Sequence, residues 1–105
     1  MGEVVAKAKD DRSEPRDEVL YRTRASRADG TPVELVVVNI SARGLMARCA
    51  APIAPGERLR VRLPEIGSIP AEVRWALGGR IGCQLDQVIP LDRYSVLLAT
   101  MAKSA

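Results

Sequence analysis

The strongest constraint on the fold of this chain is a series of six short segments in which apolar and polar residues alternate. A period of two turns every second side chain to the same face of a β-strand, so the alternating segments predict strands with one buried face. Residues 33–40 differ, because they are apolar on both faces and predict a strand that is covered on both sides or lies under another element. Asp29-Gly30 and Gly78-Gly79 each separate two such segments, and both dipeptides are strong signals for hairpin turns. The expected strands cover residues 18–28, 33–40, 44–50, 58–63, 69–77 and 80–85.

The period changes after the last of these segments. Pro90 suits the first turn of a helix, and Asp92 complements the helix dipole there. Apolar residues then recur at helical spacing, at Leu91, Tyr94, Leu98 and Met101. Six short strands followed by one amphipathic helix predict an all-β fold, a six-stranded antiparallel β-barrel with a C-terminal α-helix.

The alternation also predicts which side chains point into the core. In residues 69–77 the expected inward set is Ala71, Val73, Trp75 and Leu77. Trp75 and Tyr94 are therefore interpreted as core and helix packing rather than as stacking platforms. Cys49 and Cys83 fall at inward strand positions, so we expect two reduced core cysteines that are not bonded to each other.

The length of 105 residues leaves room for one domain with one core. Residues 1–11 are charged and show no periodicity, so they are expected to form a flexible tail before a single domain at residues 12–105. The chain has no apolar run of about 18 residues and no signal-peptide pattern, which predicts a cytoplasmic protein without a membrane span.

The composition argues against catalysis. The chain has no histidine, which removes the usual general base and the Ser–His arrangements that activate a serine nucleophile. Cys49 and Cys83 are far apart in sequence and lack the spacing of a zinc site. We therefore expect no enzyme activity, no metal site and no cofactor.

Two short motifs point to ligand binding. Residues 39–44 read Asn-Ile-Ser-Ala-Arg-Gly, and about two dozen residues earlier Arg12 and Arg16 form an R-x-x-x-R pair. With 13 arginines in the chain, the arginine pair alone carries little information. The pattern [D/N]-x-S-x-x-G, in contrast, is expected by chance only about 0.03 times in a chain of this composition.

Together the two motifs resemble the ligand signature of the PilZ domain, a bacterial receptor for cyclic di-GMP. The resemblance extends over residues 54–63, which look like the family's turn-then-strand segment, and over Val73-Arg74-Trp75 and residues 80–85. It implies that Arg12 and Arg16 clamp guanine and phosphate of the ligand, and that Asn39 and Ser41 form hydrogen bonds to it. Leu85 stands where the family often has Phe.

The residue chemistry fits this implied ligand. Arginine can donate two hydrogen bonds to the O6 and N7 atoms of guanine, and its planar guanidinium group can stack on the base. Residues i and i+2 of an extended segment face the same way, so Asn39 and Ser41 are expected to address one ligand together. Gly44 would allow a tight turn or a close approach of the ligand to the backbone.

The sequence also leaves alternatives open. The chain could be a PilZ-like protein-interaction module that does not bind nucleotide, or an Arg-rich small barrel that binds RNA or single-stranded DNA. The second alternative has little support, because only three aromatic residues are present and the net charge is only +3. The arginine row Arg58, Arg60 and Arg62 is interpreted as a solvated strand face.

The expected mechanism is a receptor or adaptor. Ordering a mobile segment lowers the free energy available for binding, so ligand binding is expected to be coupled to ordering of the arginine arm around residues 10–17. The expected partners are cyclic di-GMP and an unidentified effector protein, with no nucleic acid. The protein would be a monomer or a ligand-dependent dimer.

Overall fold

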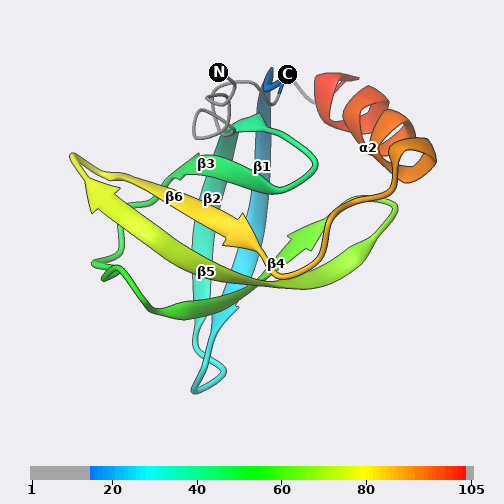
Figure 1. Cartoon of the computed structure of the whole chain (residues 1–105). Coiled ribbons are helices and arrows are strands. Elements are labelled where there is room, and N and C mark those ends of the chain that lie inside the picture. The colour runs from blue at the N-terminus through cyan, green and yellow to red at the C-terminus, as the bar shows by residue number, and fades with distance from the viewer. Residues whose placement is uncertain (1–14, 104–105) are drawn as a thin grey trace, which may run out of the picture.

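A computed structural model describes residues 15–103 of the chain. Within this range six β-strands are followed by one α-helix, in the predicted order (Figure 1). The elements are β1 (Asp17–Arg27), β2 (Pro32–Ile40), β3 (Gly44–Arg48), β4 (Arg58–Leu63), β5 (Gly67–Leu77), β6 (Arg80–Leu85) and α2 (Leu91–Lys103). The predicted tail, residues 1–11, and Arg12 lie outside the described residues.

The six strands close into an antiparallel barrel in the order β1-β2-β3-β6-β5-β4. Closure pairs every strand on both sides, so no strand among the described residues is left with an open edge. β4 shows how the alternation produces the barrel wall, because Leu59, Val61 and Leu63 are buried whereas the arginines between them are exposed. The predicted all-β barrel with a C-terminal helix is confirmed.

β5 departs from the predicted alternation. Val73 pairs with Cys83 but Trp75 pairs with Gly82, so one extra residue forms a β-bulge between Val73 and Trp75. The extra residue reverses the two faces for the rest of the strand. Ala71 and Val73 are fully buried as predicted, but Trp75 is 39% exposed and Leu77 is 80% exposed. The predictions that Trp75 and Leu77 point inward, and that Trp75 packs in the core, are therefore wrong.

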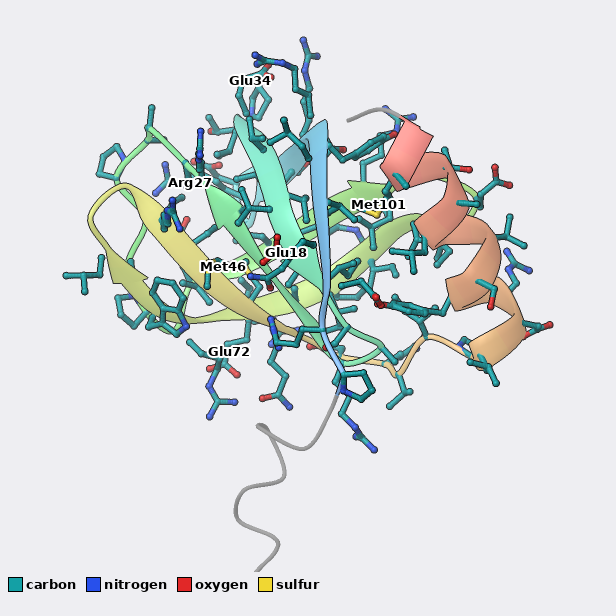
Figure 2. All side chains as sticks on the ribbon, turned by 90° about the horizontal axis from the view of Figure 1, so that it is seen from above. Glu18, Arg27, Glu34, Met46, Glu72 and Met101 are labelled. Atoms are coloured by element: carbon teal, nitrogen blue, oxygen red, sulfur yellow. The ribbon has the colours of Figure 1, made fainter. Side chains whose placement is uncertain are left out.

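α2 lies at the end of the barrel where β1 begins (Figure 1). Its Leu97 and Met101 are fully buried, and Figure 2 shows Met101 between the helix and the strands. Tyr94 and Leu98 pack against the same core at its margin, as predicted. Leu91, also predicted to pack there, is instead 80% exposed, because the buried stripe of α2 begins one turn later. No helix in residues 15–103 is long and apolar enough to cross a membrane.

The barrel interior contains both cysteines. Cys49 and Cys83 are buried and free, as expected from their inward positions. Burial raises the pKa of the Cys83 thiol to about 12, with a smaller contribution from Cys49. The Cys83 thiol is therefore protonated at neutral pH, and it behaves as a small apolar side chain of the core.

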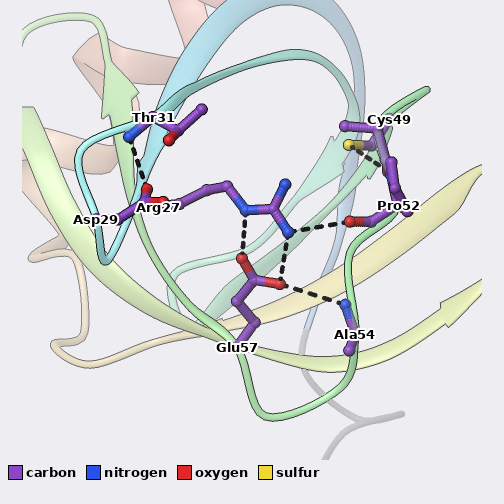
Figure 3. A network of polar contacts seen from close by, with 8 residues as sticks. Arg27, Asp29, Thr31, Cys49, Pro52, Ala54 and Glu57 are labelled. Atoms are coloured by element: carbon purple, nitrogen blue, oxygen red, sulfur yellow. Dashed lines mark hydrogen bonds and ion pairs between the residues drawn. The ribbon is translucent and has the colours of Figure 1, made fainter.

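A network of polar contacts surrounds Arg27 at the C-terminal end of β1. Arg27 donates from Nε to Glu57 Oε2 at 2.7 Å and from Nη2 to Glu57 Oε1 at 3.2 Å (Figure 3). The same Nη2 donates to the carbonyl oxygen of Pro52 at 3.0 Å, and Glu57 accepts a bond from the amide of Ala54. These bonds tie the end of β1 to the segment that connects β3 and β4.

Candidate functional site

The structure brings Arg16 and Asn39 together although they are 23 residues apart in sequence. Arg16 directly precedes β1, and Glu18 pairs with Asn39 across the β1–β2 ladder. The Arg16 side chain donates to Asn39 Oδ1 from Nε at 3.1 Å and from Nη2 at 2.9 Å. One arginine of the R-x-x-x-R pair therefore touches the first residue of the second motif, at the outer wall of the barrel.

Asn39 also faces β3. It pairs with Met46 in the β2–β3 ladder, and its Nδ2 lies 3.7 Å from Met46 Sδ. Asn39 uses its carbonyl oxygen on Arg16 and turns its amide nitrogen to the thioether. Asn39 is uncharged, and among residues 15–103 no carboxylate forms an ion pair with Arg16, whereas an aspartate at position 39 would do so.

Ser41 lies inside the turn that follows β2. Its side chain is fully buried, and its hydroxyl accepts bonds from the amides of Arg43 at 3.3 Å and Gly44 at 3.2 Å. The Ser41 amide donates to the Gly44 carbonyl oxygen at 2.8 Å. β2 ends at Ile40, so the strand alternation no longer applies at Ser41. The structure does not bring the Ser41 hydroxyl to the surface beside Asn39.

Gly44 is the first residue of β3 and pairs with Gln84 of β6. A Cβ atom at this position would lie 2.6 Å from the carbonyl oxygen of Cys83, which belongs to the backbone. Glycine is therefore needed because β6 approaches closely, and its backbone φ angle is not in the left-handed region. Gly44 and Ser41 together shape the turn, whereas Arg16 and Asn39 form the outer surface beside it.

This turn is bonded to the elements behind it. The carbonyl oxygens of Ala42 and Arg43 accept bonds from the amides of Ile89 and Leu85, at 2.9 and 2.8 Å. These bonds connect the turn to the end of β6 and to the segment that leads into α2. The motif therefore sits on a fixed support, which we expect to hold Asn39 in place before any ligand arrives.

α2 supports the other side of the site. The hydroxyl group of Tyr94 lies 2.6 Å from Asp17 Oδ2 and 3.0 Å from the carbonyl oxygen of Ile40. Asp17 follows Arg16, and Ile40 follows Asn39 in the sequence. One phenol therefore bridges the two chain segments that supply the surface side chains of the site.

Trp75, which the strand alternation placed inside the barrel, is part of this outer wall. Met46 pairs with Gly82 of β6, and the Trp75 indole covers Gly82 so closely that a Cβ there would lie 2.1 Å from its Nε1 atom. Asn39 is therefore about 10 Å, or two strand spacings, from the glycine under the ring. A glycine opposite an aromatic residue in a hairpin is a recurrent pairing, and it could have indicated that the ring lies outside the barrel.

These side chains suit binding better than catalysis. The outer wall offers the guanidinium of Arg16, the amide of Asn39, the thioether of Met46 and the exposed ring of Trp75. Ser41, the hydroxyl in the motif, is occupied by the backbone of its own turn, and the chain has no histidine to activate it. In residues 15–103 no group of His, Cys, Asp and Glu side chains is arranged to hold a metal ion.

Comparison with known proteins gives a consistent result. The family model described as PilZ domain matches residues 10–101. Among solved structures, the chain is similar to the crystal structure of the PilZ domain of CeSA from a cellulose synthesizing bacterium, with a TM-score of 0.56. The two are 18% identical over 83% of this chain and 94% of that chain, a likeness that shows the fold. No curated protein matches the sequence. Because the family match spans the whole barrel and the arginine motif before it, the chain belongs to the PilZ domain family.

Proposed function

We propose that this domain binds cyclic di-GMP at the outer wall around Arg16 and Asn39, and that it signals the bound state to a partner protein. PilZ domains are a known family of cyclic di-GMP receptors. The observation that carries the proposal is the bidentate contact of Arg16 with Asn39, which joins the two halves of the ligand signature on one surface.

The chemistry of the wall supports this ligand. Cyclic di-GMP has two phosphates and two guanines, and Arg16 can pair with either group because no carboxylate in the described part of the chain forms an ion pair with it. Asn39 has both a donor and an acceptor for a guanine edge. The exposed face of Trp75 is an additional surface on which a purine can stack. Arg12 lies outside the described residues and is proposed as the second clamp from the motif alone.

The turn residues have a supporting role in this proposal. Ser41 and Gly44 hold the turn against β6 and thereby fix Asn39 at the end of β2. The expected arm covered residues 10–17, but Arg16 already contacts Asn39 and Asp17 begins β1. We further propose that binding orders the part of the arginine arm before Arg16, and that the ordered arm presents a new surface to an effector protein in the cytoplasm. A binding role of this kind requires no catalytic group.

Calorimetric titration with cyclic di-GMP tests the proposal. Arg16→Ala should weaken binding by about tenfold or more, because a bidentate guanidinium contact to guanine contributes about 1–3 kcal/mol. Arg60→Ala is the matched control, since Arg60 is an exposed arginine on β4, away from Asn39. GTP serves as a control ligand.

Unchanged affinity in folded Arg16→Ala protein would contradict the assigned site. If the wild-type protein binds neither nucleotide, the domain acts through protein contacts alone. A circular dichroism melt of each variant separates lost binding from lost folding.

A further inference from the structure

A second cationic surface lies where β1 and β4 run side by side in the closed barrel. Arg22 on β1 and Arg60 and Arg62 on β4 are all exposed on the outer wall. Their neighbours across the ladders are uncharged: Arg22 pairs with Val36, Arg60 with Ser26 and Pro70, and Arg62 with Ser68. We call these three arginines the β1–β4 arginine face.

The arginine face differs from the charges around it. Arg24 pairs with Glu34 at 3.0 Å, and Arg58 pairs with Asp86. Among the described residues, in contrast, no carboxylate forms an ion pair with the guanidinium groups of Arg22, Arg60 or Arg62. Two like charges at alternate positions of a strand stand about 7 Å apart, within the screening length of physiological salt, so they repel each other. The three guanidinium groups therefore add no ion-pair stabilisation to the barrel, and their charges are available to a partner.

We propose that the β1–β4 arginine face docks an acidic, extended segment of a partner protein. An extended segment with carboxylates at alternate positions repeats every 6–7 Å or so, which matches the spacing of Arg60 and Arg62 along β4. Each guanidinium group can form a bidentate pair of hydrogen bonds with a carboxylate. Leu20, two residues before Arg22 on the same outward face and 47% exposed, adds the apolar contact that protein interfaces combine with arginine.

Two observations favour a protein over a nucleic acid. The described aromatic side chains are placed elsewhere: Tyr21 packs against the core, Trp75 covers Gly82 on the β5–β6 wall, and Tyr94 is on α2. The face therefore has no ring on which a base can stack. In addition, the ion pairs Arg24–Glu34 and Arg58–Asp86 lie next to the face, so the arginines without an ion pair form a short stretch that suits a short acidic segment better than a continuous chain of phosphates.

The end of this surface at Arg60 and Arg62 is separate from the proposed ligand site, whereas its other end at Leu20 lies two residues from Glu18. Asn39 pairs with Glu18 at the start of β1, whereas Arg60 pairs with Ser26 near the end of that strand. Ser26 is eight positions along β1 from Glu18, or about 26 Å of extended chain. A ligand at Arg16 and a partner at Arg60 can therefore be bound at the same time, as an adaptor requires.

The test uses a fluorescent synthetic peptide with Glu at alternate positions, and a matched peptide with Gln in place of each Glu. Binding is measured by fluorescence anisotropy at about 0.05 and 0.3 M NaCl, since screening weakens such contacts. The protein variants are Arg60→Gln/Arg62→Gln and the control Arg48→Gln/Arg80→Gln. The control removes the same charge from two exposed arginines that pair with each other across β3 and β6.

The proposal predicts that the Glu peptide binds the wild type, that the Gln peptide does not, and that added salt weakens binding. Arg60→Gln/Arg62→Gln should weaken binding of the Glu peptide about three- to tenfold, and the control should leave it unchanged. Equal losses in the two variants would show a response to net charge alone and would overturn the proposal. The proposal would also be overturned if the Glu peptide did not bind the wild type. It would likewise be overturned if a single-stranded oligonucleotide or anionic lipid vesicles bound more tightly than the Glu peptide. Calorimetry should show that Arg60→Gln/Arg62→Gln binds cyclic di-GMP as the wild type does. A loss of peptide binding in this variant then does not come from a damaged ligand site.

Discussion

Gly44 and Gly82 each face a neighbour that leaves no space for a side chain, but the two neighbours differ in how far they can move. A Cβ atom at Gly44 would meet the backbone carbonyl of Cys83 at 2.6 Å, and a Cβ atom at Gly82 would meet the side chain of Trp75 at 2.1 Å. The backbone of β6 is held in ladders on both sides, whereas the Trp75 ring is partly exposed and can rotate away. The same substitution therefore has different consequences at the two positions.

We predict that Gly44→Ala lowers the free energy of unfolding by about 2 kcal/mol or more, because β3 and β6 must separate to admit the methyl group. Gly82→Ala should change stability much less and should instead displace Trp75. Urea denaturation measures the first effect. The emission maximum of Trp75, the only tryptophan in the chain, measures the second. If Gly82→Ala shifts the emission of Trp75 but leaves the affinity for cyclic di-GMP unchanged, Trp75 has no part in the site.

At the scale of elements, the strands show what a sequence pattern can and cannot predict. The bounds of β4 and β6 agree with the predicted ones, because each strand alternates without interruption and follows a turn signal, Pro55-Gly56 before β4 and Gly78-Gly79 before β6. β5 was predicted as one strand, but its face reverses at the bulge before Trp75. A bulge depends on how two strands pair, so the residues of β5 alone do not reveal it.

The candidate site was predictable to a similar extent. The motif pattern identified Arg16 and Asn39, which the structure places in contact. The position of the Ser41 hydroxyl depends on hydrogen bonds within a four-residue turn, and strand periodicity carries no information about them. Trp75 was missed because its place on the wall follows from the bulge.

Arg27 and Glu57 join two elements at the far end of β1, and this contact makes stability depend on pH. The hydrogen bonds from Arg27 lower the pKa of the Glu57 carboxyl from its ordinary value of 4.5. A carboxyl whose pKa is lower in the folded state stabilises the fold above its unfolded pKa, and this contribution disappears as the pH falls through the folded pKa.

Glu57→Gln should therefore lower the melting temperature by a few degrees at pH 7, and the difference from wild type should shrink below about pH 4. Glu34→Gln is the matched control. Glu34 also forms an ion pair, with Arg24, but both side chains are largely exposed, at 79% and 69%, so its loss should change little. A difference between Glu57→Gln and wild type that stays constant from pH 7 to pH 3 would show that packing, and not charge, is responsible.

At the scale of the whole molecule, the proposed ligand site is bonded directly to α2. Tyr94 connects the helix to Asp17 and to the carbonyl oxygen of Ile40, and the amide of Ile89 connects the segment before α2 to Ala42 of the turn. A ligand that holds Arg16 and Asn39 therefore also restrains the two chain segments on which the helix rests. This arrangement gives the domain a physical route from the ligand surface to a second surface.

The route predicts a pattern of amide hydrogen exchange. Addition of cyclic di-GMP should slow exchange at Arg16 and Gly44, because a ligand that binds only the closed form makes local opening rarer. The effect should extend to Ile89, whose amide donates to the turn, and it should be small at Val61 in β4. The slowing should also reach Leu97 in α2 through Tyr94, whose phenol joins the helix to both segments. In Tyr94→Phe this contact is lost, so Gly44 and Ile89 should keep their protection while Leu97 loses most of the ligand effect. If Leu97 exchanges at the same rate with and without ligand in the wild type, although Gly44 becomes protected, then the binding surface is not coupled to α2. The partner would then have to recognise the ligand surface itself.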